Sequence, residues 1–263
     1  MVRSGMFGFL ITKTFFDMWD NMFRVLIMNL GFLAVLAILF VLAPLAGAIP
    51  PLAIAIAAVG VAALAVYAGA VSRMCADIAD YKQPGFAEFW AYLRESVPTS
   101  LLLALTVVLY VVVVIFVDFP FFASVKNLAA WLAFALLFWV TVACALALQY
   151  FFPIRARLDR KFRKLIRKSF LLLLDNPGHS LGLFIGTLLI LVVSAFTALL
   201  LPGPASILLW WNAAFKLRMY KYDYLEANPD ANRRRIPWDA LLVEDRERVG
   251  KRTLRGMIFP WKE

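Results

Sequence analysis

The sequence predicts an all-α polytopic membrane protein with six transmembrane helices arranged as three hairpins. Two observations point to this class. Hydrophobic residues make up 63% of the 263 residues and charged residues only 17%, with a mean hydropathy of +0.80, which is far from the composition of a soluble domain. The charges are also gathered in short segments and leave long uncharged runs between them. A helix needs about 20 apolar residues to cross a bilayer, and several runs reach that length.

The three uncharged regions each predict one hairpin. No charge occurs between Arg24 and Arg73, and prolines with Gly47 near the middle of this run indicate a turn. Two later runs flank the phenylalanine-rich segment 118–126, which we interpret as an interfacial turn, and Pro153 is expected to bend the end of the second. The last region follows Asp175. The predicted spans are 25–45, 52–71, 97–117, 128–154, 181–201 and 204–220, within a transmembrane domain over residues 1–220.

The distribution of Lys and Arg predicts the orientation. The turns after the first and fifth spans contain no Lys or Arg, and the turn after the third contains only Lys126. The positive-inside rule therefore places both termini in the cytoplasm of a multi-pass cell-membrane protein, with residues 221–263 as a basic tail. Asn212 interrupts the sixth span, at whose end Lys216 and Arg218 can extend to the interface. Without this span the tail would lie outside, against the rule.

A repeated apolar spacing precedes each odd-numbered span. The sets begin at Thr12, Phe86 and Phe162 and follow i, i+3, i+4, i+7, i+11, so that one helix face is largely apolar. We interpret these segments as amphipathic elbow helices at the cytoplasmic interface, over residues 7–23, 84–96 and 157–174, in a threefold internal pseudo-repeat. The alternative is that any helix entering a membrane is amphipathic near its start.

The most basic segment, 155–168, separates two long apolar runs. A cation at the centre of a bilayer costs about 2.5 to 3.5 kcal/mol, so this block is expected at the cytoplasmic surface, with Phe162, Leu165 and Ile166 toward lipid. The net charge of +10 indicates the anionic leaflet rather than nucleic acid, because the cations adjoin apolar runs. The candidate contacts for lipid or a partner are Arg155, Arg157, Arg160, Lys161, Arg163, Lys164, Arg167, Lys168, and, in an amphipathic tail segment, Lys251, Arg252, Arg255 and Trp261.

The sequence offers little for catalysis. No ionisable residue lies at the centre of a predicted span, and catalytic, nucleotide-binding and metal-binding motifs are absent. We therefore expect no enzyme, cofactor or metal site, and interpret the single histidine, His179, as a capping residue. The amides Asn29, Gln149 and Asn212, which lie within predicted spans, are candidates for lining a cavity, which without a charge would suit a neutral solute.

Two stretches carry a resemblance to a known family. The segments WDNMFRVLIMNLGFL and QYFFPIRARLDRKFRKLIRKSFLLLLDNPGHSLGLF resemble the YesV-like family of bacterial integral membrane proteins of unknown function, over about residues 7 to 215. Members of that family are often encoded near carbohydrate transport systems, so the resemblance implies an accessory role in sugar uptake. It implies no functional residues.

Three hypotheses follow for function. The first is a non-enzymatic membrane protein that is an accessory or regulatory component of a transport system, in contact with transporter subunits. The second is a homo-oligomeric channel for small neutral or weakly charged solutes. The third is a scaffold that binds membrane lipids.

Overall fold

The computed structural model describes residues 5–125, 127–233, 235–250 and 252, and every regular element in these ranges is a helix. Five helical stretches are long and apolar enough to cross a membrane. They are Met22–Leu45, Pro50–Ala79, Phe86–Phe122, Leu128–Arg157 and Pro177–Phe196. The protein is therefore all-helical with multi-pass membrane character, as the sequence predicts.

The helices are α1 (Met6–Asp20), α2 (Met22–Ala37), α3 (Ala43–Leu45), α4 (Pro50–Ala79), α5 (Phe86–Val112), α6 (Phe119–Ser124), α7 (Leu128–Leu148), α8 (Phe151–Arg157), α9 (Phe162–Asp175), α10 (Pro177–Phe196), α11 (Pro204–Ala227), α12 (Trp238–Leu241) and α13 (Val243–Val249). Two π-helical turns, Ile38–Leu42 and Val113–Asp118, join α2 to α3 and α5 to α6.

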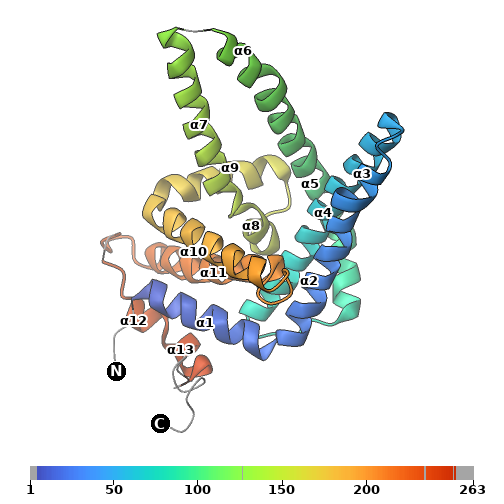
Figure 1. Ribbon diagram of the computed structural model, residues 1–263. Coiled ribbons are helices and arrows are strands. Elements are labelled where there is room, and N and C mark those ends of the chain that lie inside the picture. The colour runs from blue at the N-terminus through green and yellow to red at the C-terminus, as the bar shows by residue number, and fades with distance from the viewer. Residues whose placement is uncertain (1–4, 126, 234, 251, 253–263) are drawn as a thin grey trace.

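Two hairpins project from a common helical body (Figure 1). One is formed by α2 to α4 and the other by α5 to α7, and their tips lie apart. The body contains α1 and α8 to α11, with α12 and α13 beside α1 at the end away from the hairpin tips (Figure 1). The first and last described helices therefore lie at the same end of the molecule.

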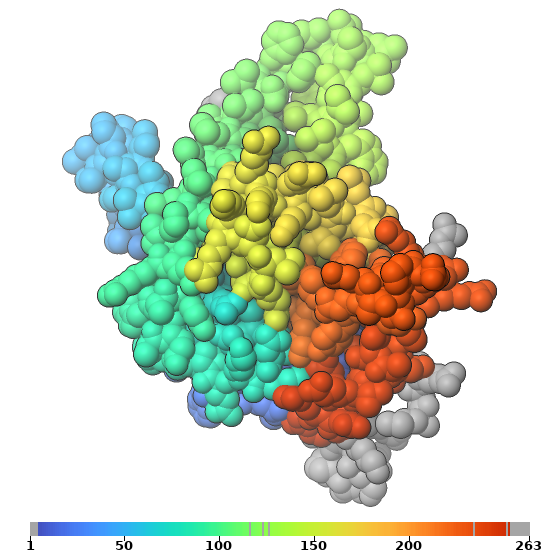
Figure 2. Space-filling model, turned by 180° about the vertical axis from the view of Figure 1, so that it is seen from behind, coloured from blue at the N-terminus to red at the C-terminus, as the bar shows by residue number. Residues whose placement is uncertain are grey.

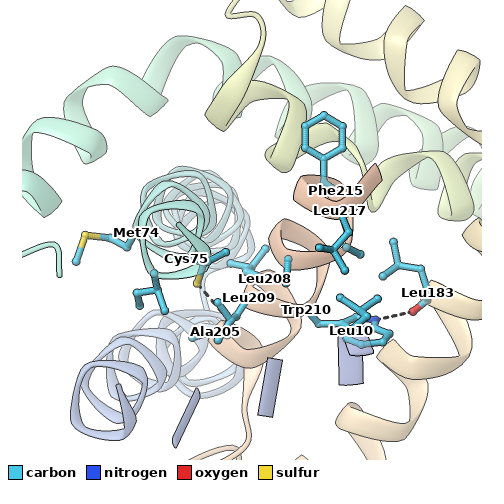
Figure 3. Close-up of a cluster of buried hydrophobic side chains, with 14 of the residues drawn as sticks. Leu10, Met74, Cys75, Leu183, Ala205, Leu208, Leu209, Trp210, Phe215 and Leu217 are labelled. Atoms are coloured by element: carbon cyan, nitrogen blue, oxygen red, sulfur yellow. Dashed lines mark hydrogen bonds between the residues drawn. The ribbon is translucent and has the colours of Figure 1, made fainter. Parts of the chain in front are cut away.

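Helix α11 is the centre of the hydrophobic core. It packs against α4, α10, α1, α2 and α8, and its buried positions lie all round its circumference. In Figure 3 the Trp210 Nε1 donates to the Leu183 carbonyl at 3.0 Å, while the Cys75 thiol bonds the Ala205 carbonyl at 3.4 Å. A Cβ added at Gly186 would lie 2.5 Å from the Trp210 ring, so the absence of a side chain there lets α10 approach α11 closely.

The segment predicted as the second elbow is not a separate helix. Residues 86–96 continue without a break into the third span as α5, with Pro98 inside the helix. Polar side chains accompany the proline: the Ser96 hydroxyl bonds the carbonyls of Val66 and Leu93. The bond to Val66 ties α5 to α4, close to Pro98, which has no amide hydrogen to donate. The predicted boundary at residue 97 is therefore wrong, and only the first and third elbow segments are separate helices, α1 and α9.

The helix of the fourth predicted span, 128–154, is interrupted earlier than the bend expected at Pro153. The helix breaks at Gln149 and Tyr150, between α7 and α8, whereas Pro153 lies inside α8 near its start. A proline is tolerated in the first turn of a helix because the amide there has no intrahelical partner. Likewise the segment 118–126 is not a turn throughout, since α6 continues to Ser124.

Helix α9 packs against the rest of the protein through the face that was predicted to contact lipid. Leu165 is fully buried, while Phe162 and Ile166 are partly buried against the core. Seen from behind, this segment (yellow) crosses the surface between the green α5 and α7 arms and the orange α11 (Figure 2). The three residues expected to face lipid therefore pack against the hydrophobic core instead.

Candidate functional site

A cluster of charged side chains connects both ends of the chain to the body. We call Lys13, Asp17, Tyr81, Lys216 and Asp245 the charged cluster. Lys13 and Asp17 lie on α1, and Tyr81 follows the end of α4. Lys216 lies on α11 and Asp245 on α13. Lys13 and Asp17 are one helical turn apart on α1 and form an ion pair of 2.6 Å, with exposures of 0% and 6%. Such an amphipathic helix can place an acid and a base together at i, i+4.

Tyr81 organises the centre of the charged cluster. It ends α4 in the left-handed conformation, with φ of 60°, which is uncommon for a bulky residue. Its hydroxyl donates to Asp245 Oδ1 at 2.6 Å. The ammonium groups of Lys13 and Lys216 lie 4.0 and 4.5 Å from the centre of its ring, within the range of cation–π attraction.

Asp245 is the attachment point of the tail. Lys216 Nζ lies 2.9 Å from its Oδ1, and the Asp245 side chain is 3% exposed. Lys216 also bonds the Ala79 carbonyl at 3.0 Å and lies 3.7 Å from Asp80. The expectation that Lys216 extends to the interface is therefore replaced by a buried link between α4, α11 and α13.

The protonation of the charged cluster reflects its burial. Burial raises the pKa of Asp17 to about 6, against the attraction of Lys13, and burial lowers the pKa of Lys13. Both shifts favour the neutral pair. Burial alone would raise the pKa of Asp245, but the hydrogen bonds from Tyr81 and Lys216 and the charge of Lys216 lower it overall. Asp245 is thus the carboxylate that stays ionised.

A pocket of about 170 Å³ lies beside the charged cluster. Its walls come from α1, the segment after α4, and α13 with Arg252. Two of the lining residues are paired, since Arg252 Nη1 donates to both carboxylate oxygens of Asp20 at 2.9 and 3.0 Å. Sequence reasoning missed this site, although the Lys13 and Asp17 spacing was visible. The contributions of Tyr81 and Asp245 had no sequence signal.

The basic block divides into two parts. Arg155 is 5% exposed and bonds Thr99 Oγ1 at 2.7 Å and the Gly69 carbonyl at 3.4 Å. Arg157 pairs with Asp80 at 2.5 Å and bonds the Ala76 carbonyl at 3.0 Å. Both guanidinium groups join α8 to neighbouring helices, so the expected surface role is wrong for Arg155 and only partial for Arg157. Arg155 and Arg157 differ from the later cations of the block because they lie on α8, which is packed inside the helical body.

The second part of the basic block lies on the outside of α9. Arg160 is 72% exposed and lies 3.3 Å from Glu95, while Lys164 and Lys168 flank Asp159 at 3.6 and 3.4 Å. The remaining members, Lys161, Arg163 and Arg167, are exposed. In the tail, Lys251, Arg255 and Trp261 lie outside the described residues.

The three candidate cavity amides are all buried between helices. Asn29 donates to the Leu200 carbonyl and accepts from the Ala205 amide. Gln149 donates to the Ser180 carbonyl at 2.8 Å, and Asn212 to Ser72 Oγ at 2.8 Å. Each joins separate elements, and none lines the pocket beside the charged cluster. Their contacts are those of interhelical hydrogen bonds.

His179 lies in the first turn of α10, packed 5.1 Å from the ring of Phe7. Within the described part of the chain, His, Cys, Asp and Glu side chains form no group of three that could hold a metal ion. No protein-family model, curated protein or solved structure matches the chain.

Proposed function

We propose that this chain is a non-enzymatic integral membrane protein that serves as an accessory or regulatory component of a transport system. Its two hairpins would offer surfaces to other membrane subunits, and its charged cluster would hold the cytoplasmic ends together. The resemblance to the YesV-like family points to carbohydrate uptake as the process. The proposal rests on how little of one hairpin is covered by the rest of the chain.

That hairpin is the pair of arms α5 and α7. Of the residues in α7, only Ala130 and Ala147 are buried. Large side chains on its outside, such as Trp131 and Trp139, are 72% and 66% exposed. Helices in a membrane associate through close packing and interhelical hydrogen bonds, and α7 has few of either within this chain. An uncovered apolar arm suits the transmembrane helices of another subunit.

Two features favour a cytoplasmic location for the charged cluster. The contact between Arg252 and Asp20 places the described end of the tail beside α1. Five crossings would put these segments on opposite sides, so we propose that α11 returns the chain as a sixth span. With the excess of Lys and Arg at this end, the rule of positive charge inside favours the cytoplasm.

A photocrosslinking experiment in cells tests the partner surface. A photoreactive residue at Trp139 on α7 should give a protein crosslink, and one at Phe196 on α10, which is 87% exposed, serves as the lipid-facing control. Native purification with mass measurement should then give a particle heavier than the 29.6 kDa chain. A monomer crosslinked only to lipid at Trp139, with sugar uptake unchanged on deletion, would refute the proposal.

A further inference from the structure

Arg218 is a buried cation with no acid at ion-pair distance in the described part of the chain, although Asp175 acts on it at longer range. It lies on α11 with 8% exposure, and within the described residues its Nε makes no hydrogen bond. Its guanidinium lies 5.8 Å from the centre of the Trp238 ring. A buried cation is costly unless an anion or hydrogen bonds compensate it.

His179 lies within electrostatic range of this cation. It is 5% exposed, and neither ring nitrogen has a hydrogen-bond partner in the described part of the protein. Arg218 and Lys221 are close enough to act on it electrostatically. Lys221 has an acid, since its Nζ lies 3.3 Å from Asp175. Asp175 thus serves two cations, Lys221 in direct contact and Arg218 at longer range, so one positive charge remains in excess among these three residues.

The first turn of α10, which carries His179, adds the backbone amides of Gly178 and His179, since Pro177 has no N–H and the Ser180 amide bonds the Asn176 carbonyl. The side chain of Asn176 makes no capping bond to the turn. It instead bonds Asp175, Tyr222 and Lys221. The early amides of a helix have no carbonyl partner within the helix and carry partial positive charge. A Cβ added at Gly178 would meet nothing within 4 Å, so the turn is open to an approaching group.

We propose that the first turn of α10, together with Arg218 and His179, binds a phosphate group. Phosphate oxygens accept bonds from a guanidinium, an imidazole and helix amides at once. In the proposed orientation this turn lies at the cytoplasmic interface, where lipid phosphates are found. The phosphate can come from a phospholipid headgroup or from solution. This site is separate from the exposed cations of α9 and does not depend on the transport role.

Ligand binding by the purified, delipidated protein tests the site. Native mass spectrometry should show phosphatidylglycerol retained by the wild-type chain and diacylglycerol, which lacks phosphate, not retained. Arg218→Gln should weaken the phosphatidylglycerol complex by about tenfold or more, as expected for a charge-assisted bond. Arg163→Gln removes an exposed cation of α9 and is the matched control, expected to change binding less than about twofold. Equal losses in both variants would reduce the effect to general surface attraction and overturn the proposal.

A second variant guards against misfolding of Arg218→Gln. Gly178→Glu places a carboxylate in open space beside the turn, where an acid stabilises a helix start. The variant should fold at least as well as the wild type, and its complex with phosphatidylglycerol should be weakened as much as that of Arg218→Gln. Inorganic phosphate added at constant ionic strength distinguishes the two sources: competition with the lipid in wild type indicates that free phosphate also enters. If Gly178→Glu folds and retains the lipid fully, the proposal fails.

Discussion

At the scale of single residues, burial decides which charges have a structural role. Lys13, Lys216 and Arg155 all belong to segments that the sequence predicts as cytoplasmic and basic, yet each is enclosed: Lys13 pairs with Asp17 in its own helix, whereas Lys216 and Arg155 bond residues of other helices. Exposed ion pairs contribute little to stability, whereas an enclosed charge depends on its partner. Substitutions in the charged cluster should therefore lower the free energy of unfolding more than substitutions of the exposed cations of α9.

Removing Lys216 should destabilise the protein strongly. In Lys216→Met the Asp245 carboxylate, 3% exposed, keeps its hydrogen bond from Tyr81 but loses its ion pair with Lys216. A buried charge without its partner destabilises the folded state by about 3 kcal/mol. Chemical unfolding in detergent measures the loss. The control Lys164→Met removes a cation that is 59% exposed, with an expected change below about 1 kcal/mol. Similar midpoints for the two variants would contradict the structural role of the pair.

The Lys13 and Asp17 pair should give stability a pH dependence. The pKa of Asp17 is raised by burial to about 6 in the folded protein, from an ordinary value of 3.8 for this carboxyl. Between these values the folded state binds more protons than the unfolded state, so this group makes stability fall as pH rises from about 4 to about 6. Asp17→Asn should flatten that part of a profile of unfolding free energy against pH. An unchanged slope would show that Asp17 does not cause it.

At the scale of elements, buried amides hold the ends of helices together. Asn29 on α2 bonds the Leu200 carbonyl at 2.8 Å and the Ala205 amide at 2.9 Å, so it caps the start of α11 from another helix. This contact joins segments that are far apart in the sequence. It explains why a polar residue occurs within an otherwise apolar stretch of α2.

Replacing Asn29 should lower stability rather than alter a solute path. Asn29→Ala leaves the Leu200 carbonyl and the Ala205 amide without partners, at a cost of about 2 kcal/mol. The control Thr106→Ala removes an exposed hydroxyl that bonds only the Leu102 carbonyl in its own helix, and should change little. A variant with changed liposome flux but wild-type unfolding would favour the cavity hypothesis instead.

At the scale of the whole molecule, the contacts of the tail restrict the topology. Asp245 bonds Tyr81 after α4, and Arg252 bonds Asp20 of α1, so these regions lie together at one end of the molecule. The tips of the hairpins lie at the other end of the molecule (Figure 1). A membrane-impermeant thiol reagent can distinguish the two sides.

Labelling should therefore differ between the two ends of α5 and α6. In a background with Cys75→Ala and Cys144→Ala, the variant Ser124→Cys near a hairpin tip should react in intact cells. Ala87→Cys, at the opposite end of the same arm, should react only after permeabilisation. Both positions are exposed, so accessibility within the protein is matched. Reaction of Ala87→Cys in intact cells would reverse the proposed orientation.

The sequence by itself predicted the all-helical, multi-pass class and the separate helices α1 and α9. It predicted six spans, of which five coincide with helices long and apolar enough to cross a membrane. Long uncharged runs and apolar spacing are local properties, and hydrocarbon forces such runs to become helices. Only the tertiary structure decided that residues 86–112 form one helix, that Leu165 faces protein, and that Arg155 lies inside. It alone joined Tyr81, Lys216 and Asp245. Burial depends on which distant segments pack together, and hydropathy along the chain does not contain that information.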